Sequence, residues 1–473
     1  MTFNSLTFIA FFAIVLFLHR LPLAWSVKKL NLLIASYLFY AAWNPPFVIL
    51  LWLSTMVDWW AARRIHESAT QGRRRAWLML SLSANLGLLG YFKYGGFLLE
   101  NWAALMAGFG IEWQAPAWDI ILPVGISFYT FQTLSYTLDV YLRRAAPATS
   151  LLDFSLFVTF FPQLVAGPIV RPTDLMPQFA APRTATAQQM TWGLMLMTLG
   201  LFEKIVLADG LLAPVVDAVY GSNQALPMLD AWLGTIAFSG QIFCDFAGYT
   251  TTAIGCSLVL GFSLIDNFRY PYAALGFSDF WRRWHISLST WLRDYLYVPL
   301  GGNRKGPGRT YVNLMLTMLI GGLWHGAAWT FVVWGGLHGL YLVVERFLRQ
   351  RIGDWPLWQR WYSRVLLIAL TYALVNITWV FFRAQEFATA WRVLGGMLGF
   401  GADGAPLLST YELASVLVVM VPLLAVHGYM RERALHAEVQ RLPLLAVGVL
   451  WGAMAFLIAI TQGGSDAFIY FQF

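Results

Sequence analysis

The sequence predicts an all-α polytopic membrane protein, and three observations support this fold class. Of the 473 residues, 59% are hydrophobic and only 12% are charged, whereas a soluble protein carries about 25% charged residues. The apolar runs are long and continuous, which favours membrane-spanning helices over a β-barrel. Aromatic residues make up 16% of the chain, a content that is typical of interfacial belts and of an aromatic-lined cavity.

The charge and cysteine content argue against several other classes of protein. The net charge is +7, but the basic residues cluster between apolar runs, so they indicate membrane topology and not nucleic-acid binding. Cys244 and Cys256 both lie in apolar sequence, so we expect neither a disulfide framework nor a cysteine-rich metal site. The first apolar run, 3–18, lacks a basic leading region and a cleavage site, and we expect it to be retained as a span.

Basic loops predict the topology of the N-terminal half, because such loops remain in the cytoplasm. This rule places the N-terminus outside. We expect a helix break at Asn44-Pro45-Pro46, and a broken or re-entrant segment over 151–183, which contains several prolines. We expect 229–262 to form one long helix or a pair kinked near Gly248. The other expected helical segments of this half are 3–18, 31–44, 47–62, 76–98, 120–142 and 189–218.

The C-terminal half is predicted to contain a helical hairpin followed by three spans. Residues 311–324 rise from a basic cytoplasmic loop and 327–345 return to another, so His325 should lie at the turn. The remaining spans are expected at 365–382, 411–430 and 442–461, and the tail 462–473 is expected to end outside. The chain 1–473 is therefore predicted to form a single membrane domain of roughly 11–14 helical elements.

Three of the seven histidines, His285, His325 and His338, lie within residues 279–345. An ionisable side chain inside an apolar membrane segment is costly, so it is a candidate functional group. His325 is interpreted as a general base that takes a proton from an acceptor hydroxyl. The alternative is a packed histidine that donates to a carbonyl freed at Gly321-Gly322. His338 is more simply a packing residue, and the other four histidines are expected at loop edges.

The stretch Trp281-Arg282-Arg283-Trp284-His285, with Arg293 and Asp294 shortly after it, has two interpretations. It is either an interfacial amphipathic helix or an electrostatic entrance for an anionic cytoplasmic donor, such as a phosphorylated cofactor. Asp245, inside an apolar run, either pairs with a buried cation or hydroxyl or lines a wet cavity. The sequence contains no metal-ligand motif and no phosphate-binding loop of the Gly-x4-Gly-Lys type.

The chain ends in the apolar sequence FIYFQF, residues 468–473. One interpretation is an anchor at the outer membrane interface, where aromatic side chains prefer to lie. The other is that the tail enters an outward-facing cavity and presents the phenol of Tyr470, which acts as a nucleophile once a base is near.

These motifs resemble the membrane-bound O-acyltransferase superfamily, and within it the bacterial branch that includes the alginate O-acetylation membrane protein and the D-alanyl teichoic acid transfer protein. The resemblance runs from about Leu30 to the C-terminus. The family commonly has Asp-Phe-Ser-Gly-Tyr-Ser-Asp where this chain has Asp-Phe-Ala-Gly-Tyr-Thr-Thr, at 245–251. The segments that carry the resemblance are 280–295 (FWRRWHISLSTWLRDY), 321–326 (GGLWHG), 123–129 (PVGISFY) and 161–168 (FPQLVAGP).

The resemblance implies a ring of helices around a central funnel, with re-entrant and interfacial helices. It implies that His325 is the essential histidine, that His285 is the second signature position, and that Tyr470 carries the acyl group transiently. It also implies a cytoplasmic thioester donor, with acetyl-CoA expected, and no permanently bound cofactor or metal. An extracytoplasmic SGNH-type acetyltransferase or a similar partner would then pass the acetyl group to a polysaccharide hydroxyl.

The sequence thus predicts an O-acetyltransferase of the bacterial inner membrane that serves an exported cell-envelope polysaccharide, with both termini outside. Its partners would be the polysaccharide, membrane lipid and the exported acetyltransferase, with no nucleic acid. Alternative acceptors are peptidoglycan, teichoic acid and lipid. Alternative classes are a transporter with a histidine proton relay and a non-catalytic scaffold. The candidate substrate-binding and donor-binding residues are Arg282, Arg283, Trp284, Arg293, Asp294, Trp324 and Asp245.

Overall fold

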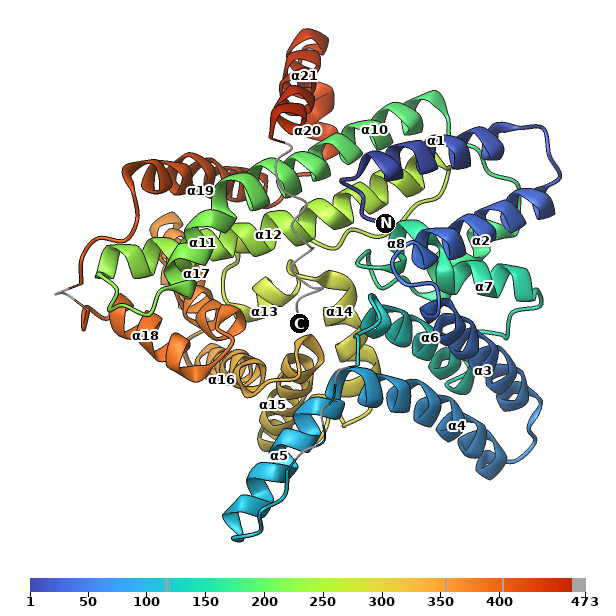
Figure 1. Cartoon of the computed structure of the whole chain (residues 1–473), viewed down its shortest axis with the longest axis horizontal. Helices are drawn as coiled ribbons and strands as arrows, with labels where there is room; N and C mark the ends of the chain where they lie inside the picture. Colours follow the sequence, from blue (N-terminus) through green and yellow to red (C-terminus); the bar gives the residue numbers. More distant parts are fainter. Residues whose placement is uncertain (115, 117, 119, 354, 402–403, 462–473) are drawn as a thin grey trace. The chain divides into compact units, whose positions relative to one another are not determined.

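The computed structural model describes residues 1–114, 116, 118, 120–353, 355–401 and 404–461. Every regular element in these ranges is a helix (Figure 1), as the all-α prediction requires. The chain packs as two compact units, one made of Met1–Leu194 with Ala253–Ile265 and the other of Met195–Thr252 with Asp266–Phe473. That the two units work as one membrane domain stays a prediction.

Within the described ranges, four helices are long and apolar enough to cross a membrane. They are α12 (Met228–Val259), α16 (Trp329–Ile352), α17 (Trp361–Arg383) and α19 (Thr410–Met430). The apolar helices α1 (Leu6–Arg20) and α21 (Leu444–Ile460) are shorter, at 15 and 17 residues. The 32 residues of α12 are one continuous helix, which decides between the two arrangements expected for this segment.

The first unit contains the helices α1 to α9, and the predicted breaks occur where prolines lie. Residues 42–46 separate α2 from α3, and the proline-containing segment after residue 150 divides into short helices, as expected. The elements of this unit after α1 are α2 (Trp25–Ala41), α3 (Phe47–Glu67), α4 (Gln71–Leu89), η1 (Gly90–Tyr94), α5 (Gly95–Gly108), α6 (Ile126–Tyr141), α7 (Leu151–Thr159), α8 (Phe161–Leu164), α9 (Pro172–Leu175) and η2 (Met176–Phe179).

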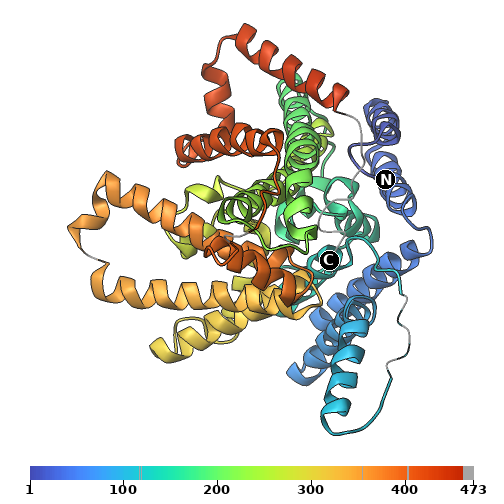
Figure 2. The ribbon, with the colours of Figure 1, turned by 60° about the vertical axis from the view of Figure 1, so that its left-hand side comes forward.

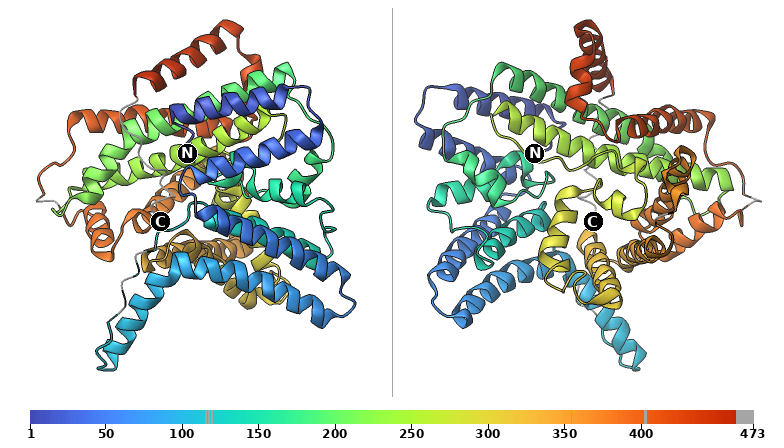
Figure 3. Two further views of the ribbon diagram at one scale, coloured as in Figure 1. Left: turned by 45° about the vertical axis from the view of Figure 1, so that its right-hand side comes forward. Right: turned by 180° about the vertical axis from the view of Figure 1, so that it is seen from behind.

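A buried carboxylate joins three helices of the first unit. Asp58 on α3 is fully buried and accepts hydrogen bonds from Ser81 and Asn85 on α4 and from Thr137 on α6, the last two at 2.7 Å. Figure 3 shows α3 and α4 running side by side in blue. A buried polar group is stabilising only when its hydrogen bonds are satisfied, so this cluster fixes the register of the three helices.

The second unit holds the remaining helices, and several of them are too short to span a bilayer. These short elements raise the number of segments above the 11–14 counted from the apolar runs. The elements are η3 (Phe202–Leu212), α11 (Ala213–Gly221), η4 (Pro271–Ala273), α13 (Phe277–Trp281), α14 (Ile286–Leu292), η5 (Arg293–Tyr297), α15 (Gly306–His325), η6 (Pro356–Gln359), α18 (Phe387–Met397) and α20 (Leu435–Arg441), besides α12, α16, α17, α19 and α21. Helix α10 (Ala187–Leu201) precedes η3 and begins in the first unit, and the end of α12, from Ala253 on, also belongs to the first unit.

The helices α15 and α16 form the predicted hairpin and pack closely along their length (Figure 2). Glycines make this contact possible. A Cβ atom on Gly322 would lie 2.3 Å from the carbonyl oxygen of Phe331, and one on Gly335 would lie 2.3 Å from that of Met318. Because the obstructing atoms are backbone, no side-chain rotation relieves the clash, and only glycine permits this helix separation.

We expect Gly335→Ala to separate α15 from α16 and to lower the free energy of unfolding by about 1–3 kcal/mol, the usual cost of overpacking. Gly336 is the matched control, because a Cβ there meets only the Leu319 side chain, at 3.5 Å. Gly336→Ala should therefore be neutral or slightly stabilising. Thermal unfolding of the two purified variants in the same detergent provides the comparison, and equal melting temperatures would contradict this packing argument.

Candidate active site

His325 is the last residue of α15, and α16 begins at Trp329. The structure therefore confirms the predicted position at the turn of the hairpin. The side chain is buried, with only 3% exposed. The turn packs closely on α16: a Cβ on Gly326 would lie 2.1 Å from the ring of Phe331, so a larger residue after the histidine would have to displace this buried ring.

Aromatic rings surround the His325 imidazole. Its ring centroid lies 4.9 Å from that of Trp334 and 5.0 Å from that of Trp324, in both cases edge to face. The ring of Phe382, on α17, lies 5.3 Å away. Three helices thus contribute aromatic rings to the wall around this imidazole. Such an environment excludes water and strengthens any electrostatic interaction made there.

The structure brings His285 close to His325, although 40 positions separate the two in sequence. Their ring centroids are 6.3 Å apart, and the Trp324 ring lies 5.9 Å from that of His285. The ring of Phe246, on α12, packs edge to face on His285 at 4.7 Å. His285 is completely buried. The two candidate histidines and Trp324 therefore form one cluster.

Backbone geometry holds His285 in place. Its φ of +43° lies in the left-handed region, which costs a non-glycine residue about 1–2 kcal/mol. Asn267 braces the turn: its carbonyl oxygen accepts from the Ile286 N–H at 2.9 Å, and its side-chain oxygen accepts from the Ser287 N–H at 3.1 Å. Strained residues cluster at functional sites, and Asn267 is a positioning residue that the sequence analysis missed.

The arginines of the basic stretch differ in what they contact. The Arg283 guanidinium donates to Asp279 at 3.0 Å and to Glu432 at 3.0 Å, and its side chain is only 12% exposed. The Arg293 guanidinium makes two hydrogen bonds to the adjacent Asp294, at 2.7 and 3.2 Å. The Arg282 side chain is 67% exposed, and its nearest carboxylate oxygen, on Asp279, is 3.9 Å away. Arg282 is therefore the most accessible cation of this stretch.

Asp279 is the centre of the ion pairs that fix this segment. Its carboxylate accepts from Arg283 and from Arg431, the latter at 2.6 Å, and also from the Leu275 N–H at 3.0 Å. Burial alone would raise the pKa of Asp279, but the Leu275 N–H and the two guanidinium groups hold it below its ordinary value of 3.8. On the other side, Glu345 of α16 accepts from the backbone N–H groups of Phe277 and Ser278.

Asp245 pairs with a buried cation, which decides between the two roles left open for it. Its carboxylate lies 2.6 Å from the Lys204 ammonium, and Lys204 also contacts Asp209 at 2.7 Å. Lys204 and Asp209 belong to the π-helical segment η3, so this ion pair ties η3 to α12. Asp245 immediately precedes Phe246, the residue whose ring packs on His285.

Two further buried histidines serve packing. The Thr378 hydroxyl donates to the Val375 carbonyl at 2.7 Å, so its oxygen accepts from the His338 Nε2–H at 3.0 Å. His338 thus has the structural role expected for it. His427 was predicted at a loop edge, and this is wrong. It lies within α19, is 2% exposed, and accepts a hydrogen bond from the Tyr272 N–H at 3.3 Å.

The other predicted site residues have defined positions, with one exception. Trp284 is fully buried and stacks on Phe280, with centroids 5.7 Å apart, so it belongs to the core of the second unit. Tyr470 and the tail 462–473 lie outside the described residues. Within the described ranges no group of three His, Cys, Asp or Glu side chains is arranged to hold a metal ion.

The described part of the chain, in which every regular element is a helix and four helices are long and apolar enough to cross a membrane, is that of a multi-pass membrane protein. The profile of the membrane-bound O-acyltransferase family matches residues 138–380. The chain belongs to this family and is an acyltransferase. It is 42% identical to the protein named Probable alginate O-acetylase AlgI of Azotobacter vinelandii, over 90% of this chain and 85% of that protein. It is 39% identical to the Peptidoglycan O-acetyltransferase of Helicobacter pylori, over 78% of this chain and 74% of that protein. It is 27% identical to the Teichoic acid D-alanyltransferase of Bacillus subtilis, over 58% of this chain and 71% of that protein.

The ion pairs of Asp279 predict a pH dependence of stability. A carboxylate whose pKa is lowered on folding contributes stability above its ordinary pKa of 3.8, and this contribution is lost as the pH falls below that value. Asp279→Asn should lower the free energy of unfolding at pH 7 by about 1–3 kcal/mol. The difference from wild type should shrink as the pH falls below 3.8. Thermal unfolding between pH 7 and pH 3 measures both effects.

Asp266→Asn is the matched control, because Asp266 pairs with Arg269 at 3.6 Å with both side chains more than 60% exposed. An exposed pair of this kind contributes about 0–1 kcal/mol, so its removal should change the melting temperature little at any pH. An Asp279→Asn variant that behaves like this control would refute the central role of Asp279.

Proposed function

We propose that the protein transfers an acetyl group from acetyl-CoA, bound from the cytoplasmic side, toward a hydroxyl group of an exported cell-envelope polysaccharide, with His325 as the general base. The observation that carries this proposal is the burial of His325 beside His285, inside a wall of aromatic rings at the hairpin turn. A buried ionisable group in a membrane protein indicates function more often than packing.

The proposed reaction has two proton transfers, and one imidazole is able to serve both. Neutral His325 takes the proton from the attacking hydroxyl as the oxygen bonds to the thioester carbonyl carbon. The carbon–sulfur bond then breaks, and the departing thiolate takes the proton back from the imidazolium. General base catalysis of this kind contributes about 10²–10⁴-fold in rate. Exclusion of water by the surrounding rings protects the thioester from hydrolysis.

His285 is proposed to position the reacting groups beside His325. Its imidazole is 6.3 Å from that of His325, measured between ring centroids, so the two rings are close enough to act on one substrate. Arg282, the exposed arginine of the same segment, is the best-placed cation for a phosphate of the donor. For Arg283 and Arg293 the observed pairing with carboxylates favours a structural role.

The acceptor that first receives the acetyl group is proposed to be the phenol of Tyr470, in the apolar tail. A partner outside the membrane, of the SGNH type or similar, would then pass the group to the polymer. A relay of this kind separates attack on the cytoplasmic thioester from delivery to an external hydroxyl. It accords with the prediction that the tail and the N-terminus lie outside the inner membrane.

An alginate-like exopolysaccharide is the favoured final acceptor, because a relative named for alginate O-acetylation is 42% identical over most of both chains. Peptidoglycan is the second candidate, and the 39% identity to a peptidoglycan O-acetyltransferase supports it. Both acceptors are hydroxyl-bearing sugar polymers, so the proposed chemistry at His325 is the same for either.

We expect His325→Gln to reduce acetyl transfer by about 10²–10⁴-fold, the usual contribution of a general base. Glutamine keeps a polar side chain of similar reach but does not take up a proton at neutral pH. The measurement is the rate at which labelled acetyl-CoA is consumed in proteoliposomes that contain the purified chain, the partner and the polymer.

His338→Gln is the matched control, because His338 is also buried among aromatic rings on the adjacent helix but is bonded to Thr378. This variant should lose stability while keeping most of its transfer rate.

Tyr470→Phe separates the two routes of transfer. Label on the tail of wild type that disappears in both His325→Gln and Tyr470→Phe supports the relay, whereas transfer that survives Tyr470→Phe means direct delivery. Full activity of His325→Gln would show that His325 is not the general base.

A further inference from the structure

The first unit contains a basic cavity where the ends of α3, α4 and α6 meet. Its volume is about 510 Å³, within the range of about 300–1,000 Å³ that is typical of small-molecule sites. The lining residues are His66, Ser68, Arg74, Val140, Arg143, Arg144, Ala145 and Ala146. Three of the eight are arginines and none is acidic, so the lining has a strong positive charge without an internal counter-charge.

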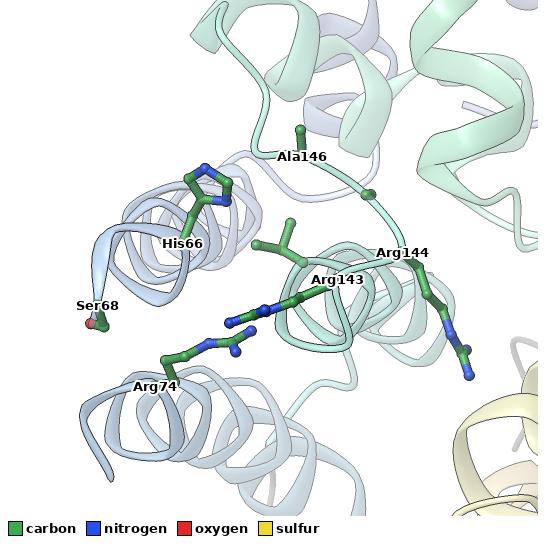
Figure 4. Close-up of a pocket in the computed structure, with 8 residues that line it drawn as sticks. His66, Ser68, Arg74, Arg143, Arg144 and Ala146 are labelled. Carbon is green, nitrogen blue, oxygen red and sulfur yellow. The ribbon is translucent and has the colours of Figure 1, made fainter. Parts of the chain in front are cut away.

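Two of the arginines converge. The side chains of Arg74, from α4, and Arg143, from the end of α6, extend toward each other across the cavity, whereas Arg144 points away (Figure 4). Arg144 has a carboxylate at 3.9 Å, on Asp139. Two guanidinium groups that face each other repel, although water reaches the exposed Arg143 and screens part of this repulsion from the buried Arg74. An anion between them would remove this cost.

Arg74 is built into the wall of the cavity. It is only 8% exposed, its Nη2 donates to the Tyr141 carbonyl oxygen at 2.6 Å, and its guanidinium lies 5.4 Å from the Tyr141 ring centroid. A guanidinium has five N–H donors, so this single bond fixes its orientation and leaves donors for a ligand. A fixed guanidinium loses less entropy on binding than a mobile one.

Arg143 occupies a backbone position that would suit a different residue. Its φ is +58°, in the left-handed region where glycine or asparagine fits with less strain. An arginine in this conformation directs its long side chain into the cavity beside Arg74. The backbone strain at Arg143 is therefore a second observation, besides the basic lining of the cavity, that indicates a functional role for this arginine.

We propose that this cavity binds the phosphate group of a phosphate ester, held between the guanidinium groups of Arg74 and Arg143 with His66 at its edge. Arginine pairs match phosphate oxygens in two-bond geometry, which suits them to this anion more than to a halide. Two ligands share this chemistry: the headgroup of an anionic phospholipid, and a soluble phosphate metabolite. Basic pockets between helices on the cytoplasmic side bind such headgroups, and the positive-inside rule predicts that this end of the unit is cytoplasmic. The site is independent of the function proposed for His325.

The test is the binding of phosphate probes to the purified full chain and to Arg143→Asn. Asparagine removes the charge yet tolerates the left-handed backbone. One arm titrates phosphatidylglycerol against phosphatidylcholine with the same acyl chains. The other arm titrates coenzyme A against pantetheine, which lacks the phosphates. We expect the anionic member of one pair, phosphatidylglycerol or coenzyme A, to bind wild type about tenfold more tightly than it binds Arg143→Asn, because the variant loses charged hydrogen bonds to the phosphate. The arm that responds identifies the source of the ligand.

Arg73→Gln is the matched control, because Arg73 is exposed one residue away on α4 and does not line the cavity. It should bind both probes as wild type does. Arg143→Lys keeps the positive charge but loses the paired N–H donors of the guanidinium, so we expect an intermediate affinity. This variant also provides the test if Arg143→Asn does not fold. Affinities unchanged in both Arg143 variants, or reduced equally by Arg73→Gln, would overturn the proposal.

Discussion

The contact between α15 and α16 is the constraint on which the candidate active site depends. Where Gly322 meets Gly335, the two backbones approach so closely that a methyl group on either residue would overlap a carbonyl oxygen. This separation fixes how tightly the chain turns after His325, and so it fixes where the imidazole lies. Trp334, on the returning helix, then packs edge to face against that imidazole. The second helix thus packs against the His325 side chain and restricts its position, as a precise site on rigid elements requires.

Ion pairs and hydrogen bonds to carboxylates hold the segment that carries His285, the second histidine of the cluster. The segment that carries His285 is too polar to be a simple span, and carboxylates hold it from two sides: Asp279 through Arg283 and Arg431, and Glu345 through the backbone N–H groups that begin α13. Each of these charges has a partner, as buried charges require. The cost of keeping charges in a largely apolar unit is thus offset locally. The result is that His285, 40 residues before His325, meets it within an aromatic cluster.

The sequence was sufficient for the helical class, for the hairpin and for the position of His325 at its turn. Long apolar runs separated by arginines define spans, and Gly321–Gly326 marks a turn, because both patterns act over a few residues. Other features could not be predicted, since they depend on contacts distant in sequence. Asn267 gives no local signal that its side chain will brace Ser287. His427 lies near the end of the expected span 411–430, and the sequence gives no sign that the ring of Phe243, distant in the chain, packs on its imidazole and buries it. Arg282 and Arg283 are adjacent and of the same type, so the sequence does not distinguish them. They differ in the carboxylates that each guanidinium contacts.

The central claim is that acetyl transfer takes place at His325, within the aromatic cluster. A cryo-electron microscopy structure of the full chain with an acetyl-CoA analogue, in which a methylene group replaces the thioester sulfur, tests this claim most directly. We predict that the analogue binds beside the His325 imidazole. Its carbonyl carbon should lie about 4 Å or less from the place where a hydroxyl oxygen hydrogen-bonded to that imidazole would sit, as near-attack geometry requires. A bound analogue whose carbonyl lies roughly 10 Å or more from that ring, beyond the reach of direct proton transfer, would contradict it.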